Sequence, residues 1–141
     1  MRRRLPFAFI ALGLALLAAA IPVYRRASAG PSVRTVHIAI HFSHFSVSDV
    51  DVRPGETVRF VIDNTDPIDH EFIIGDRWLQ RVYEHGSEPV HVATPGALSV
   101  PAGTTQTMTY TFPATPTPAL SFACHLPGHY AYGMHGAFSI A

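Results

Sequence analysis

The sequence predicts an all-β protein, an antiparallel two-sheet sandwich of about eight short strands with Greek-key connections. Apolar and polar residues alternate along several short segments, which is the period of a half-buried strand. Turns rich in Gly and Pro separate these segments at short intervals. The chain has 141 residues, of which 48% are hydrophobic and only 14% charged. This length and composition favour one folded domain with a single core.

The first half of the predicted sandwich holds four strands. Residues 36–42 have apolar side chains at every second position, and residues 50–52 continue this pattern. A turn at residues 53–56 contains Pro and Gly, which favour tight turns. Residues 57–63 form the next alternating strand, and residues 70–74 form the fourth.

The second half holds four more strands. Residues 97–100 predict a short strand, followed by a Pro-Ala-Gly-Thr turn at residues 101–104. Residues 105–112 alternate Thr with larger side chains, as a half-buried strand does. Residues 120–123 and 137–140 complete the set.

Two segments interrupt the strand pattern. Residues 75–95 contain Leu79, Val82 and Tyr83 at i, i+3 and i+4 spacing, which predicts a short helix or a lid-like loop. Residues 113–118 are rich in Thr and Pro and predict a polar hairpin loop.

Residues 1–29 indicate an export signal or a membrane-anchor helix. Three Arg at positions 2–4 precede an uncharged stretch at residues 5–23, and Ala-Ser-Ala at 27–29 is typical of a cleavage site. Because the stretch is also close to the length that spans a bilayer, cleavage and retention as an anchor both stay open. In either case we expect the domain of residues 30–141 to lie outside the cytoplasmic membrane, whether it is periplasmic, secreted or anchored to the membrane.

Charge and Cys content exclude two classes of protein. From residue 30 onward there are five Arg against ten Asp and Glu, a formal charge of −5 with His neutral. An acidic domain is not expected to bind nucleic acid through its phosphates. A single Cys rules out a disulfide framework within the chain.

The C-terminal segment concentrates metal-binding side chains. Cys124, His129 and Met134 follow one another at C-x4-H-x4-M spacing. Thiolate and thioether are soft ligands that favour copper, and imidazole suits copper as well. A trigonal site needs a second His, and His70 stands at a loop-to-strand junction from which a neighbouring strand can deliver it. Zinc, the main rival, rarely takes a thioether ligand.

The sequence resembles the cupredoxins, the family of plastocyanin, azurin and rusticyanin. The Leu-Pro-Gly-His run at residues 126–129 is most similar to the rusticyanin type of ligand loop. The resemblance also covers residues 45–72 and 100–103. It therefore spans nearly all of the domain of residues 30–141 and implies a cupredoxin-like, copper-binding Greek-key sandwich.

The resemblance also implies the metal site. It would hold one copper ion, cycling between Cu(I) and Cu(II), in a mononuclear blue (type 1) centre. His70, Cys124 and His129 would be the trigonal ligands and Met134 the long axial ligand. One position departs from plastocyanin and azurin, because Glu71 stands where they have an Asn that helps to hold the ligand loops together.

Enzyme classes do not fit the residues. Multicopper oxidases place a His on each side of the Cys, but here Ala123 precedes Cys124 and only His125 follows it. A binuclear copper centre needs two Cys ligands. The sequence therefore predicts a protein that is not an enzyme.

Two functions remain. The first is a monomeric electron carrier that exchanges single electrons with exported or membrane redox proteins, which would meet the surface around His129. The second is a copper-binding protein for storage, delivery or homeostasis outside the cytoplasm. Histidines expected at the surface favour the second as ligands for copper uptake: His37, His41, His44, His125 and His135. A closed thiolate site with a fixed Met favours the first, because such a site releases metal slowly.

Overall fold

The computed structural model describes residues 33–85, 95–115 and 119–140, so the N-terminal segment of residues 1–29 lies outside the described part of the chain. The described elements are β1 (Arg34–His41), β2 (His44–Phe45), β3 (Asp49–Val52), β4 (Thr57–Asn64), β5 (His70–Asp76), α1 (Arg77–His85), β6 (Ala97–Val100), β7 (Thr105–Thr111), β8 (Leu120–Ala123) and β9 (His135–Ile140). Within these ranges no helix has the length and apolar character needed to cross a membrane.

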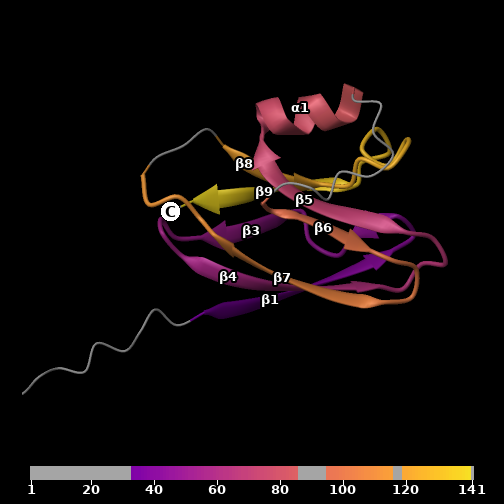
Figure 1. Ribbon diagram of the computed structural model, residues 1–141, viewed down its shortest axis with the longest axis horizontal. Coiled ribbons are helices and arrows are strands. Elements are labelled where there is room, and N and C mark those ends of the chain that lie inside the picture. The colour runs from indigo at the N-terminus through magenta and orange to yellow at the C-terminus, as the bar shows by residue number, and fades with distance from the viewer. Residues whose placement is uncertain (1–32, 86–94, 116–118, 141) are drawn as a thin grey trace, which may run out of the picture.

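The strands form two facing sheets, which confirms the predicted all-β sandwich (Figure 1). One sheet has the strand order β2-β1-β4-β7, and the other has the order β3-β9-β8-β5-β6. The chain crosses repeatedly between the sheets, for example from β3 to β4 and from β4 to β5. Every strand expected from the sequence is present, and the two-residue strand β2 was not predicted.

The sheets are mixed, whereas the sequence pattern predicted an antiparallel sandwich. Strand β1 runs parallel to β4, and β3 runs parallel to β9. Neither pair is joined by a hairpin, because other strands intervene along the chain in both cases. Only tertiary packing decides such pairings, and alternation within a single strand carries no information about the direction of its partner.

Aromatic side chains fill the space between the sheets. Phe60, Phe72, Phe112 and Phe122 are fully buried, and Phe138 is nearly so. Their rings meet mostly edge to face or tilted, with neighbouring centroids 4.9–6.4 Å apart. Such contacts add to the hydrophobic stabilisation from burial. They give the sandwich a rigid interior beneath the loops that carry the candidate ligands.

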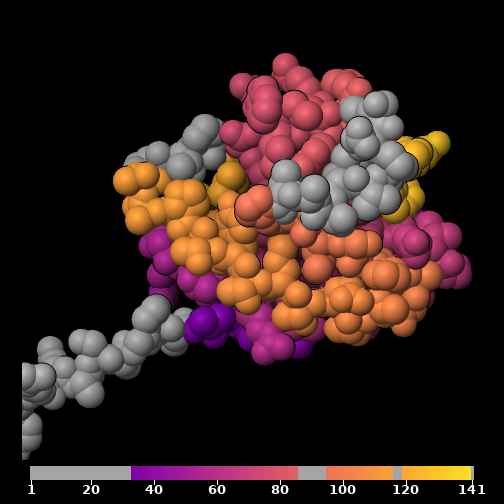
Figure 2. Space-filling view, in the orientation of Figure 1, coloured from indigo at the N-terminus to yellow at the C-terminus, as the bar shows by residue number. Residues whose placement is uncertain are grey.

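Within residues 75–95, for which a short helix or a lid-like loop was predicted, the described part forms helix α1. It contacts β5 and β8 on the outer side of the five-stranded sheet (Figure 1). In the space-filling view it stands out as a bulge on the body of the sandwich (Figure 2). The helix packs through a polar residue as well as through apolar ones. Gln80 is its buried residue, while Val82 remains 42% exposed. Leu79 packs closely against Gly75, where a methyl group would clash with the Leu79 side chain.

Candidate metal centre

The pairing of β5 with β8 brings the predicted ligands together. These strands are antiparallel, with Ile73 opposite Ala123. The start of β5 therefore lies beside the end of β8. His70 is the first residue of β5, and Cys124 directly follows β8. Residues that are 54 positions apart in the sequence thus meet at one end of the sandwich.

The donor atoms of His70, Cys124 and His129 all lie within 4.8 Å of one another, and we call these three residues the donor cluster. The Nδ1 atoms of the two histidines are 3.2 Å apart, and Cys124 Sγ is 3.2 Å from His129 Nδ1. His70 and Cys124 are buried, whereas His129 is half-buried. The cluster therefore reaches the surface through His129.

The backbone of Met134 is hydrogen-bonded to two residues of the donor cluster. Its N–H donates to the carbonyl of His129, and its own carbonyl accepts from the N–H of Cys124, each at 3.0 Å. Its side chain is fully buried in the same apolar core as that of Cys124. These two hydrogen bonds fold the loop of residues 124–134 back on itself, so that all four predicted ligands lie at the same end of the fold.

The Cys124 thiol of the donor cluster keeps its proton in the metal-free protein at neutral pH. Burial raises the pKa of the Cys124 thiol to about 11, and the nearby Glu71 carboxyl adds to the rise, although the backbone N–H groups of Glu71 and Leu126 oppose it. Burial also lowers the pKa of His129, and the neighbouring His70 lowers it further. A metal that takes the thiolate as ligand must therefore displace a proton.

Asn64 shapes the loop that leads into β5. Its side-chain Nδ2 lies within hydrogen-bond distance of three backbone carbonyl oxygens, those of Ile68, Val100 and Pro101, at 2.9, 2.9 and 3.1 Å. Its Oδ1 accepts the N–H of Asp66 at 3.0 Å. Because Asn64 is buried, these bonds hold the loop firmly against the turn after β6.

Asp66 contacts the donor cluster directly, which the sequence analysis did not foresee. Its Oδ2 lies 3.0 Å from Nε2 of His70. Burial, the largest single influence, raises the pKa of this carboxyl, but hydrogen bonds from the N–H groups of Ser43 and Phe42 and from His70 together outweigh it and lower the pKa. Asp66 is therefore ionised at neutral pH. The four-residue spacing to His70 was visible in the sequence but indicated no contact.

Glu71 occupies the position where plastocyanin and azurin have Asn. Its backbone N–H points at the donor cluster and donates to Cys124 Sγ at 3.3 Å. Such a bond favours the thiolate over the thiol. The Glu71 side chain is buried, only 1% exposed, so its carboxyl lies inside the fold next to the donor cluster.

The expectation that His125 lies on the surface is wrong. Its side chain is fully buried because α1 covers it. Its Nε2 lies 2.6 Å from Oε1 of Gln80, and its Nδ1 lies 3.2 Å from Oε2 of Glu84. The ring also stacks on Tyr130, with centroids 5.0 Å apart. Because His125 follows Cys124 directly, α1 supports the start of the ligand loop.

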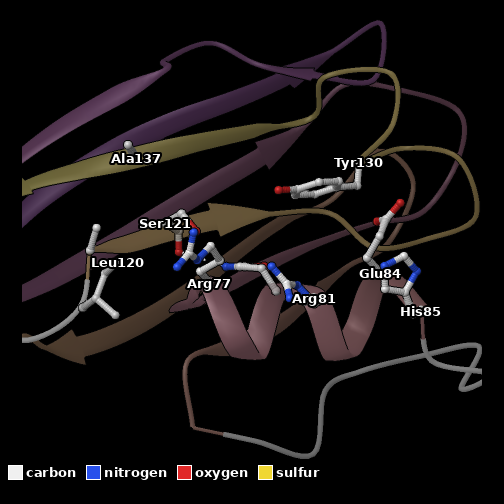
Figure 3. A pocket seen from close by; sticks show the side chains of 10 residues that line it. Arg77, Arg81, Glu84, His85, Leu120, Ser121, Tyr130 and Ala137 are labelled. Atoms are coloured by element: carbon white, nitrogen blue, oxygen red, sulfur yellow. Dashed lines mark hydrogen bonds between the residues drawn. The ribbon is translucent and has the colours of Figure 1, made fainter.

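A separate open pocket of about 470 Å³ lies between α1 and strands β8 and β9. Figure 3 shows Glu84 of α1 and Tyr130 of the ligand loop close together at one end of it, with Arg77 and Arg81 along the helix. No member of the donor cluster is among the described residues that line this pocket. It is therefore distinct from the candidate metal centre.

The other histidines behave mostly as expected. His37, His41, His44, His85 and His135 are exposed, whereas His91 lies outside the described residues. His41 and His44 face each other across the β1–β2 pair. Neither belongs to the donor cluster.

The donor cluster fits a copper ion. Two imidazole nitrogens and one sulfur face one another, two of the three residues being buried and the third half-buried. A metal ion can satisfy all three at once. Thiolate and imidazole, together with a buried thioether in the adjacent loop, form a soft set of ligands. Copper prefers such a set.

Among solved structures, the fold is similar to that of dithionite-reduced auracyanin from the photosynthetic bacterium Roseiflexus castenholzii. The TM-score is 0.64, with 24% identity over 78% of this chain and 98% of that chain. The two-sheet sandwich is thus of the cupredoxin fold class, and its donor cluster can hold a copper ion.

The sequence comparison shows the particular family. The chain is 35% identical over 119 residues to the copper-resistant cuproprotein CopI of Rubrivivax gelatinosus, covering 82% of this chain and 71% of that protein. It is 28% identical over 180 residues to the protein of the same name from Pseudomonas aeruginosa, covering 99% and 97%. The chain belongs to the family of the copper-resistant cuproprotein CopI. No general family model matches the sequence.

Proposed function

We propose that the protein is a type 1 copper protein that holds one copper ion through His70, Cys124 and His129, with Met134 as the axial ligand. The observation that carries this proposal is the convergence of three buried or half-buried donor atoms within 4.8 Å of one another. When bound, copper supplies a single-electron step between Cu(I) and Cu(II). The chain supplies the ligand positions and excludes water from them.

We further propose that the protein carries single electrons. The two strands that hold His70 and Cys124 pair over an aromatic core, so the ligand positions are fixed before and after an electron moves. His129 is half-buried while His70 and Cys124 are buried, which makes the His129 edge the shortest route to a partner. Exported or membrane redox proteins are the partners that this role requires, and no substrate is transformed.

A second candidate is a role in copper resistance, in which the protein stores the ion or hands it on. The names of its relatives, copper-resistant cuproproteins, favour this role. The exposed cross-strand pair of His41 and His44 offers imidazoles at the surface that suit copper uptake. In the first candidate function copper stays bound while electrons move. In the second, the protein takes up copper and later releases it.

The place of action follows from the N-terminal segment. Basic residues, an uncharged stretch and a small-residue site within residues 1–29 indicate export, so we propose that the domain works outside the cytoplasmic membrane as a monomer. A single Cys in such an oxidising location is protected from oxidation when it is buried and bound to metal, and Cys124 is buried.

Competition between electron exchange and copper release separates the two candidates. Copper-loaded protein is reduced and then mixed either with a one-electron oxidant or with a Cu(I) chelator, and both rates are followed by stopped-flow absorbance. An electron carrier completes many redox cycles before the chelator removes a significant share of the copper. Copper loss at a rate comparable with oxidation would contradict the carrier role and favour delivery.

Replacing Met134 by Leu tests the axial position. We expect the variant to keep its copper but to show a higher reduction potential, because the lost thioether stabilises the oxidised ion more than the reduced one. The expected rise is on the order of 60 mV, which corresponds to a tenfold change in the ratio of Cu(I) to Cu(II) affinity. Protein-film voltammetry measures it, with Met108→Leu as the matched control on β7. Equal reduction potentials for Met134→Leu and Met108→Leu would contradict Met134 as the axial ligand.

A further inference from the structure

Asp66 is a buried carboxylate whose two oxygens each receive hydrogen bonds. Its Oδ1 accepts the N–H of Phe42 at 2.8 Å, and its Oδ2 accepts the N–H of Ser43 at 2.7 Å. The same Oδ2 lies 3.0 Å from Nε2 of His70. The carboxyl group is 7% exposed and thus joins the β1–β2 turn to a member of the donor cluster through bonds that water does not weaken.

The turn that Asp66 holds is strained. Phe42 and Ser43 have φ values of 50° and 53°, the left-handed region that residues other than Gly seldom occupy. A residue in this conformation persists only where its surroundings enforce it. Here both strained N–H groups converge on one carboxylate. The strained turn fixes Asp66 in place, as Asp66 fixes the turn.

The carboxylate also determines which ring nitrogen of His70 carries the proton. Both carboxylate oxygens of Asp66 already accept backbone N–H groups, so they act as acceptors here, and Nε2 of His70 is the donor of the bond to Oδ2. A neutral imidazole with a proton on Nε2 has its lone pair on Nδ1. That Nδ1 is the atom facing His129 at 3.2 Å inside the donor cluster. The arrangement has the form of a carboxylate–histidine pair that orients a metal ligand.

We propose that Asp66 is a positioning residue, which holds His70 in the Nε2–H tautomer and in a fixed ring orientation, anchored by the strained Phe42–Ser43 turn. The Nδ1 lone pair is then directed into the donor cluster before copper arrives. The proposal rests on the copper site proposed above, but its first test needs no copper.

The first test is the tautomer of His70 in the metal-free full-length protein, read from the ¹⁵N chemical shifts of the ring by long-range ¹H–¹⁵N NMR. The expected result is a single Nε2–H tautomer. A proton on Nδ1, or a mixture of both tautomers, would overturn the proposal even if the protein binds copper and carries electrons normally. A failure of electron transfer leaves this readout unchanged, so the two failures are distinguishable.

The second test compares Asp66→Asn with Asp69→Asn. Both variants remove one negative charge from the same loop, but Asp69 is exposed and its carboxylate accepts only the N–H of Ala102, at 2.9 Å, among the bonds the structure describes. We expect Asp66→Asn to lower Cu(II) affinity by about 10- to 100-fold, the usual effect of losing such a partner. Asp69→Asn should change it by less than about twofold, as a surface substitution does.

Two further readouts separate positioning from a loss of folding. The ¹⁵N shifts of Asp66→Asn should show mixed His70 tautomers, and its copper absorption spectrum should differ from that of the wild type. If Cu(II) affinity falls ten times more than Cu(I) affinity, the potential rises by about 59 mV. Equal affinities, spectra and potentials in the two Asn variants would overturn the role of Asp66. If Asp66→Asn does not fold, the tautomer of His70 in the wild-type protein decides whether the proposal stands.

Discussion

Cys124→Ser should abolish the intense visible absorption of the copper-loaded protein. That absorption comes from charge transfer between a thiolate and Cu(II), and Cys124 is the one Cys in the chain. A serine hydroxyl stays protonated and hard, so it replaces neither the charge nor the softness of the sulfur. We expect Cu(II) affinity to fall by more than the roughly 10- to 100-fold that a lost outer partner costs. Visible spectroscopy and competition titration measure both effects.

Proton release gives an independent check on the same variant. The pKa of the Cys124 thiol is raised to about 11, so the metal-free wild type carries this proton at neutral pH. Copper uptake by the wild type should release about one proton into a weakly buffered solution. The serine variant should release none from this position. A variant that remained blue, or that released as many protons as the wild type, would contradict Cys124 as a ligand.

Phe122→Ala should cause the largest loss of stability. Phe122 is fully buried, and its ring lies 5.2–5.4 Å from those of Phe45, Phe72 and Phe138. Truncating a buried Phe to Ala costs about 3–5 kcal/mol. That is a large part of the roughly 5–15 kcal/mol by which a typical domain is stable. The Phe122 ring also packs directly on Gly136, where a methyl group would clash with it.

Urea unfolding of the metal-free protein measures the loss, with Phe42→Ala as the matched control. Phe42 has the same side chain but is 78% exposed, so its truncation should change the free energy of unfolding by less than about 0.5 kcal/mol. Since Phe122 lies two residues before Cys124 along β8, the Phe122 variant should also bind copper less tightly. Equal losses in the two variants would contradict the description of the core.

The strands were predictable because alternation is a local property. Segments such as residues 57–63 carry the period of two that a half-buried strand imposes on its side chains. The parallel pairing of β1 with β4 was not predictable, because register and direction depend on partners distant in the sequence. The two-residue strand β2 is too short to show any period.

The candidate ligands were predictable from residue type and spacing, whereas the groups around them were not. Cys124, His129 and Met134 are close in the sequence, and His70 was suggested by its place at a loop-to-strand junction, in agreement with the resemblance to cupredoxins. The contact of Asp66 with His70 depends on a loop held by Asn64, and the burial of His125 depends on α1 folding back over β8. Both are consequences of tertiary packing that the local pattern does not contain.

The most direct test of the copper site is a visible absorption titration of the full-length protein with Cu(II), followed by reduction and reoxidation. We expect an intense blue or green band that saturates at one equivalent, bleaches on reduction and returns on oxidation. A protein that binds Cu(I) tightly but never develops this band would contradict a type 1 centre at His70, Cys124 and His129. It would mean that these side chains serve copper capture instead.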